Sequence, residues 1–171
     1  MKVFVTGIII IVSFVLQTAI FHQIPYIGVK PDLTTAVVVS LSIILGKDGG
    51  AIAGFAGGMI HDVMFSKPVG VDALSYMIVG YLVGMNSERI FKDNLVVPII
   101  FTLGATVLRH SIIIFFYYVF NMGIPFLYYI RNIVLLEGLY NCITAVIIYK
   151  LLYAVYHKRF MEEGFKVKRS R

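Results

Sequence analysis

The sequence predicts an all-α integral membrane protein with six transmembrane helices in one bundle. Of its 171 residues, 59% are hydrophobic and only 14% are charged, and the mean hydropathy is +0.88. A soluble domain of this size has too little interior to hide so much apolar side chain. The apolar residues come in long runs and do not alternate with polar ones, which indicates helices and not the strands of a barrel.

The single cysteine and the pattern of basic charge exclude other classes of protein. Cys142 lies inside an apolar run, so neither a disulfide nor a cysteine-based metal site is expected. The net charge of +6 does not indicate nucleic-acid binding. Its basic residues stand at the ends of apolar runs and in the C-terminal tail, as the topology of a membrane protein requires.

Three segments account for the first half of the predicted bundle. The run 3–21 is longer than the apolar core of a signal peptide and lacks a cleavage site, so we expect a first helix that is retained. The Pro-Asp pair at 31–32 begins a second helix that ends at Leu45, because proline suits the first turn and an acid there complements the helix dipole. A tight turn over 46–50 leads to a third helix that ends near Phe65. These two helices are shorter than an ordinary span, so either the bilayer is locally thinned or they lie inside the bundle.

Three further helices complete the predicted bundle. We expect a fourth helix over 71–86, a fifth over 95–120 and a sixth over 126–153, separated by loops that contain proline, glycine or charged residues. The domain organisation is then a six-helix transmembrane domain, 1–157, followed by a basic cytoplasmic tail, 158–171.

The distribution of basic residues predicts that both termini are cytoplasmic. With six spans, most Lys and Arg residues fall on the side of the termini, whereas Lys30 and Lys67 lie in loops on the opposite side. Basic residues concentrate on the cytoplasmic side of membrane proteins. The tail 158–171 is expected to contact anionic lipid of the bilayer, with a cytoplasmic protein partner as the alternative.

Glycines at intervals of four residues mark helix faces that lack side chains. The first face contains Gly46, Gly50, Gly54 and Gly58 with Gly57 in a parallel row, and the second, shorter face contains Gly80 and Gly84. In a bilayer such faces let two helix backbones approach closely. Two interpretations are open: the faces pack the protein's own helices together, or they dock a helix of another membrane protein.

Two ionisable residues inside the predicted spans are candidates for a buried ion pair. Arg109 in the fifth helix and Glu137 in the sixth lie at similar distances from the same end of these antiparallel spans. A lone charge at that depth would cost several kcal/mol, so pairing is expected. The pair is interpreted as a structural clasp between helices, and a proton or substrate relay is the alternative.

Two acids flank the loop between the third and fourth helices. Asp72 is expected to cap the fourth helix or complement its dipole. Asp62 is expected to order the loop through hydrogen bonds with the backbone of residues 66–70. His61 adjoins Asp62, but no third ligand has suitable spacing, so no metal site is predicted.

No catalytic residues and no cofactor are predicted. The sequence contains no nucleophile with its base, no phosphate-binding loop and no zinc motif. It also has no soluble region large enough to house chemistry. We therefore expect that the protein is not an enzyme.

One segment, 30–84, carries an ordered series of motifs. It opens with Lys30-Pro31-Asp32-Leu33 and, after an apolar run, continues from Gly50 as GAIAGFAGGMIHDVMFSKPVGVDALSYMIVGYLVG. A Pro-Asp-Leu entry, a glycine-rich helix ending in Asp, a short loop with Pro and Gly, and an Asp-Ala-Leu helix ending in Gly-Tyr-Leu-x-Gly follow one another. This order resembles the family of the rod shape-determining protein MreD. His61 and Lys67 depart from the family's usual pattern.

The resemblance implies a non-enzymatic protein of the bacterial cytoplasmic (inner) membrane. The MreD family belongs to the cell-elongation (rod-shape) machinery and acts beside MreC, the actin-like MreB, the glycosyltransferase RodA and a penicillin-binding transpeptidase. Its closest expected partner is the single-span MreC, through that protein's transmembrane helix and juxtamembrane segment. The implied fold is similar to the substrate-binding subunit of energy-coupling-factor transporters. The glycine faces would then be candidates for docking MreC.

A second function belongs to a different class of protein. The same six-span architecture and buried polar residues are compatible with a small-molecule-binding membrane subunit of a vitamin transporter. That function predicts a closed polar pocket and a stoichiometric small ligand.

Overall fold

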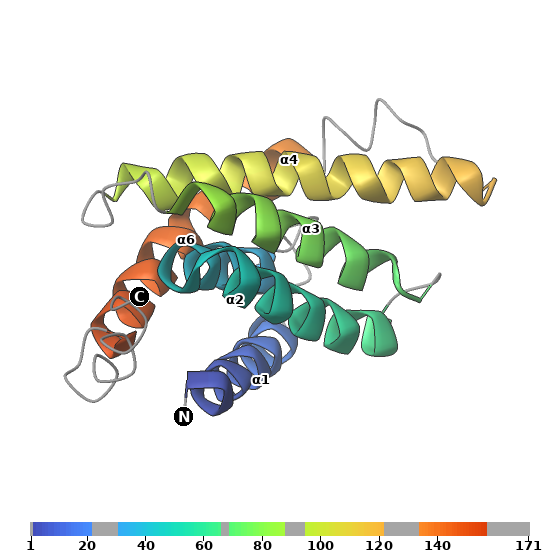
Figure 1. Ribbon diagram of the computed structural model, residues 1–171. Helices are drawn as coiled ribbons and strands as arrows, with labels where there is room; N and C mark the ends of the chain where they lie inside the picture. The colour runs from blue at the N-terminus through green and yellow to red at the C-terminus, as the bar shows by residue number, and fades with distance from the viewer. Residues whose placement is uncertain (1, 22–30, 66–68, 88–94, 122–133, 157–171) are drawn as a thin grey trace, which may run out of the picture.

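The computed structural model describes residues 2–21, 31–65, 69–87, 95–121 and 134–156. Within these ranges the chain is all-α. Figure 1 shows α3 and α4 lying side by side, with α2 next to α3 and α1 on the far side of α2. The helices are α1 (Lys2–Phe21), α2 (Leu33–Phe65), α3 (Val71–Asn86), α4 (Val96–Val119) and α6 (Leu135–Tyr156).

The helices have the length and composition of a multi-pass membrane protein. Among the described residues, three apolar helices are long enough to cross a bilayer, over Leu33–Met64, Val96–Val119 and Leu135–Tyr156, and Phe4–Ala19 is a shorter apolar helix. The fourth and fifth helices expected from the sequence agree closely with α3 and α4. The expected sixth helix begins in 126–133 and the basic tail is 158–171, and both stretches lie outside the described residues.

Gly46 divides α2 into two segments that point in different directions. Its φ of 83° and ψ of −174° are not helical, and a positive φ is easily adopted only by a residue without a side chain. The sequence predicted a turn over 46–50, which was too long, because residues 47–50 are helical. Gly49 and Gly50 are needed for close packing instead: a Cβ on Gly49 would lie 2.5 Å from the Cβ of Leu45, across the break.

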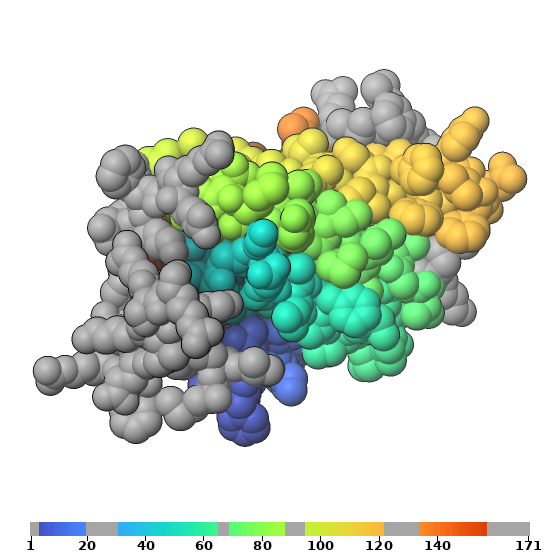
Figure 2. Space-filling view, in the orientation of Figure 1, coloured from blue at the N-terminus to red at the C-terminus, as the bar shows by residue number. Residues whose placement is uncertain are grey.

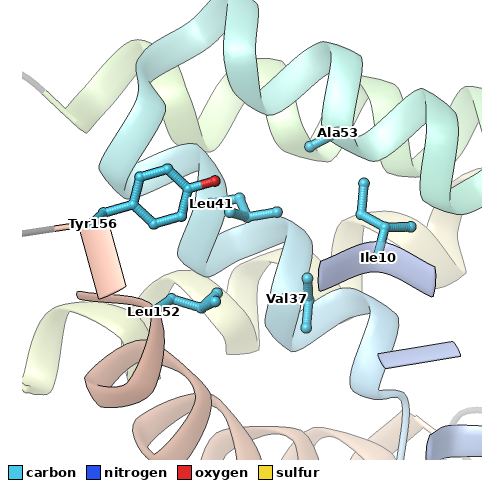
Figure 3. Packing of buried hydrophobic residues seen from close by; sticks show 6 residues of the cluster. All are labelled: Ile10, Val37, Leu41, Ala53, Leu152 and Tyr156. Carbon is cyan, nitrogen blue, oxygen red and sulfur yellow. The ribbon is translucent and has the colours of Figure 1, made fainter. Parts of the chain in front are cut away.

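The first segment of α2 lies at the centre of the bundle. Every residue from 34 to 43 is buried, so this short helix is enclosed by other helices. Figure 3 shows the apolar cluster on one side of it, where α1, both segments of α2 and α6 meet; its buried members are Ile10, Val37, Leu41, Ala53, Leu152 and Tyr156. A second cluster joins α2 to α3, α4 and α6 through Val39, Ile43, Val79, Val83, Ala105 and Tyr149.

Hydrogen bonds fix α1 at both ends. The hydroxyl oxygens of Thr6 and Tyr156 lie 2.7 Å apart, which ties the first turns of α1 to the last residue of α6. Near the other end, Gln17 Oε1 accepts hydrogen bonds from the backbone N of Thr34 at 3.2 Å and from its Oγ1 at 3.0 Å. Gln17 thereby satisfies a backbone donor in the first turn of α2 that has no partner within that helix.

Candidate functional site

Arg109 in α4 is the centre of a buried ionic cluster. Its Nη1 lies 3.1 Å from Asp32 Oδ2 and 3.3 Å from Glu137 Oε1, and its Nη2 lies 3.3 Å from Asp72 Oδ1. All four side chains are buried. A single guanidinium group therefore joins α4 to the beginnings of α2, α3 and α6.

Each of the three carboxylates stands at the start of a helix. Asp32 immediately precedes α2, whereas Asp72 and Glu137 lie in the first turns of α3 and α6. A helix N-terminus carries roughly half a positive charge. Three such ends converge on Arg109, so the helix dipoles and the guanidinium together offset the three negative charges. Without such compensation, burial of these carboxylates would cost several kcal/mol each.

Asp32 has further partners besides Arg109. The Tyr76 hydroxyl donates a hydrogen bond to Asp32 Oδ2, and the Arg109 guanidinium carbon lies 4.7 Å from the centre of the Tyr76 ring. Thr35 donates to Asp32 from its backbone N at 3.2 Å and from its Oγ1 at 2.6 Å. Asp32 is thus the N-cap of α2 and an acceptor for two other helices at once.

Asn141 connects α6 to the same cluster. Its Oδ1 accepts a hydrogen bond of 2.7 Å from the backbone N of Asp32, and its Nδ2 donates to Thr106 Oγ1 at 3.2 Å. Asn141 is fully buried. A buried amide costs free energy unless it is hydrogen-bonded, and here both of its ends are used to hold neighbouring helices.

Two histidines lie against the carboxylates of the cluster. His61 Nδ1 is 2.8 Å from Asp72 Oδ2, and His110 Nε2 is 3.1 Å from Glu137 Oε2. Among the described residues, no group of three or more His, Cys, Asp or Glu side chains is placed to hold a metal ion.

Asp62 caps α3 from the neighbouring helix. It accepts hydrogen bonds from the backbone N of Asp72 at 3.2 Å and of Ala73 at 2.7 Å. The sequence predicted bonds to the backbone of 66–70; the observed bonds lie beyond that loop, of which residues 66–68 are outside the described ranges. The cap is needed because Gly70, the residue before α3, has no side chain to supply one.

Asp72 has partners beyond its predicted role at the start of α3. It was expected to cap α3 or complement its dipole. The capping is done by Asp62, while the Asp72 carboxylate turns to Arg109 and His61. Its position in the first turn still suits the helix dipole.

The glycine face of α2 packs against the backbone of α3. A Cβ at Gly58 would lie 2.5 Å from Ala73 Cα, and a Cβ at Gly54 would collide with the backbone carbonyl of Tyr76. Real Cβ atoms do not approach backbone this closely. Only glycine therefore permits this helix contact.

The remaining glycines extend the same contact toward the break in α2. A Cβ at Gly50 would lie 2.5 Å from the carbonyl oxygen of Gly80, and a Cβ at Gly84 would lie 2.6 Å from the carbonyl carbon of Gly46. Gly57, in the parallel row, faces Thr34 Cγ2, which would be 3.2 Å from its Cβ. These faces are filled by the protein's own helices, so a partner that docks on the folded bundle must use another surface.

The structure brings Arg109 and Glu137 together and adds residues that the sequence analysis did not single out. Asp32 was interpreted only as a helix start, and Tyr76 and His110 were not considered. The sequence did contain one indication of the cluster. Acids stand at the beginnings of predicted helices, and these beginnings lie on the same side of the membrane as the end of the fifth span. The hydroxyl of Tyr76 left no comparable trace in the sequence pattern.

Removal of the Tyr76 hydroxyl tests the hydrogen bond to Asp32. Tyr76→Phe keeps the ring against Arg109 and deletes only the donor, so we expect the free energy of unfolding to fall by about 1–2 kcal/mol. The measurement is thermal or denaturant unfolding of the purified protein in detergent, followed by circular dichroism. Tyr81→Phe, on the exposed side of the same helix, is the control. Equal stability of the two variants would contradict the bond.

Comparison with known families identifies the chain. The model of the family described as rod shape-determining protein MreD matches residues 1–159, which include every helix in the described ranges and all members of the ionic cluster. No curated protein and no solved structure matches the chain. MreD proteins are shape-determining membrane proteins and not a known family of enzymes. This chain belongs to the MreD family of rod shape-determining proteins.

Proposed function

We propose that this protein is a non-enzymatic membrane scaffold of the bacterial cell-elongation machinery. It binds MreC and supports peptidoglycan synthesis by RodA and its penicillin-binding transpeptidase, in contact with MreB on the cytoplasmic side. Membership of the MreD family supports the role in rod shape. The observation that carries the scaffold function is that Arg109 contacts acids from the starts of three different helices.

The ionic cluster has the properties of a clasp. Both oxygens of each carboxylate contact a protein group: Asp32 contacts Thr35 and Arg109, Asp72 contacts Arg109 and His61, and Glu137 contacts Arg109 and His110. Acceptors that are already used in this way have little left to offer a substrate. This buried polar cluster therefore fixes the shape of the bundle, as a scaffold requires.

The orientation in the membrane is part of the proposal. The hydrogen bond between Thr6 and Tyr156 places the first turns of α1 and the end of α6 at the same end of the bundle, which supports an even number of crossings. Counted with the two segments of α2 as separate spans, the transmembrane domain 1–157 has six spans, in an arrangement similar to the energy-coupling-factor subunits. Both termini and the tail 158–171 are cytoplasmic, because basic residues concentrate on that side.

The MreC helix is proposed to dock on an outward apolar face, because the glycine faces are filled. A photo-crosslinking amino acid is placed in turn at four exposed positions, one each on α1, α2, α4 and α6, in cells that express MreC. We expect a crosslink to MreC from at least one face and none from the buried control, Val38. The positions are Ile8 on α1, Phe55 on α2, Val107 on α4 and Ile143 on α6.

The same experiment can contradict the scaffold function. Absence of an MreC crosslink at all four exposed positions would argue against it. Native mass spectrometry of the purified protein then provides the second measurement. A vitamin-like molecule retained in stoichiometric amount would favour the transporter subunit instead.

A further inference from the structure

Two neighbouring helices of the bundle, α3 and α4, differ in length by an amount that is a substantial fraction of the thickness of a bilayer. α3 has 16 residues and is therefore about 24 Å long, whereas α4 has 24 residues and is about 36 Å long. The hydrocarbon core of a bilayer is about 30 Å thick. One helix is shorter than the core and its neighbour is longer.

The contacts of Arg109 show at which end the difference falls. Its guanidinium meets Asp72 at the start of α3, and it meets Asp32 and Glu137 at the starts of α2 and α6. α3 lies beside the part of α4 that precedes Arg109, as the shared core contacts of Val83 and Ala105 show. The rest of α4, 110–119, continues past these helix starts for about 15 Å. Figure 1 shows the end of α4 projecting beyond the start of α3.

Apolar side chains are exposed both on the face formed by α2 and α3 and on the projecting part of α4. Phe55 on α2 and Tyr81 and Leu82 on α3 are exposed, and so are Phe115 and Tyr118 on the projecting part of α4. Figure 2 shows α2, α3 and α4 forming one continuous surface. In a bilayer the α2–α3 face and the α4 face both contact lipid chains. The length of apolar helix against which those chains can pack differs between the two faces.

We propose that the α2–α3 face binds phospholipids with short acyl chains in preference to long ones, and that the bilayer is thinner there than beside α4. A mismatch between the apolar length of a helix and the thickness of the surrounding bilayer costs a fraction of a kcal/mol per Å. Long chains beside the 16-residue α3 must therefore compress or tilt, whereas short chains fit. The α4 face carries no such preference for short chains.

The absence of tryptophan from the sequence permits a local test with the full-length protein. Phe55→Trp and Phe115→Trp each introduce one probe, at positions that are 48% and 62% exposed. Each variant is reconstituted in mixed vesicles of short-chain (dimyristoleoyl) and long-chain (dierucoyl) phosphatidylcholine, with one lipid brominated at a time. Quenching of the tryptophan fluorescence reports the relative affinity of the two lipids at that position.

We expect the short-chain lipid to bind about threefold more tightly than the long-chain lipid at position 55, and no such preference at position 115. Equal preferences at the two positions, or a preference for the long-chain lipid at position 55, would overturn the proposal. Ile52→Trp, at a second exposed position on the same face, replaces Phe55→Trp if the latter does not fold. Since no other protein takes part, failure here leaves the proposed binding of MreC untouched.

Discussion

Replacement of Arg109 by Gln is expected to lower the free energy of unfolding by about 3–5 kcal/mol, which is enough to reduce the amount of folded protein in the membrane. The reason is that Asp32, Asp72 and Glu137 lose the guanidinium that they share. Their carboxylates stay buried with only the helix dipoles and their other hydrogen-bonding neighbours as partners. The measurements are the yield of membrane-inserted protein and its unfolding in detergent.

Two further variants make this prediction specific. Ser111→Ala changes an exposed residue of the same helix and should leave stability within about 0.5 kcal/mol of the unmodified protein. Arg109→Gln combined with Glu137→Gln should be more stable than the sum of the two single effects, because one uncompensated acid has been removed. Additive effects would show that Arg109 and Glu137 are not coupled.

Replacement of Gly54 by Leu is expected to separate α2 from α3. A Cβ at this position would already collide with the backbone of Tyr76, and backbone cannot move aside as a flexible side chain can. The loss should be about 3 kcal/mol or more, at the upper end of the effects of overpacking. Because Tyr76 also bonds Asp32, the displacement would disturb the ionic cluster as well. Thermal unfolding in detergent measures the loss.

Gly104→Leu is the matched control for this substitution. Gly104 lies in α4, is exposed, and a Cβ there would meet nothing within 4 Å. The same change of residue type in a transmembrane helix should therefore be tolerated. If Gly54→Leu were as stable as Gly104→Leu, the close contact of α2 with α3 would be wrong.

The sequence allowed part of the ionic cluster to be predicted, because depth in a membrane can be counted along the chain. Arg109 and Glu137 lie at similar distances from one end of the predicted antiparallel spans, and in the structure Arg109 Nη1 lies 3.3 Å from Glu137 Oε1. Asp32 and Asp72 were not added to the cluster, since an acid at the start of a helix is already explained by the helix dipole. Because the helix dipole was a sufficient local explanation, the contact of each acid with Arg109 was not predicted.

The glycine pattern predicted close helix contact but not the identity of the helix in contact. A surface without side chains accepts any helix that can approach it, whether from the same chain or from another. The choice of α3 depends on the short connection after Phe65 and on the cap that Asp62 provides across it. The direction change at Gly46 was predicted, but its length was not. Glycines that permit a turn and glycines that permit packing look alike in a sequence.

The contact between α1 and α6 has a consequence for the order of assembly. Ile10 of the first helix belongs to the same apolar cluster as Leu152 and Tyr156 of the last, and the hydroxyls of Thr6 and Tyr156 are hydrogen-bonded. Contacts between such distant parts of a chain form late, because the intervening loop must close first. During synthesis, the first helix is therefore inserted in the membrane before the last helix, its later partner, has been made. A nascent chain halted before α6 would leave that flank of α1 open to chaperones and membrane proteases.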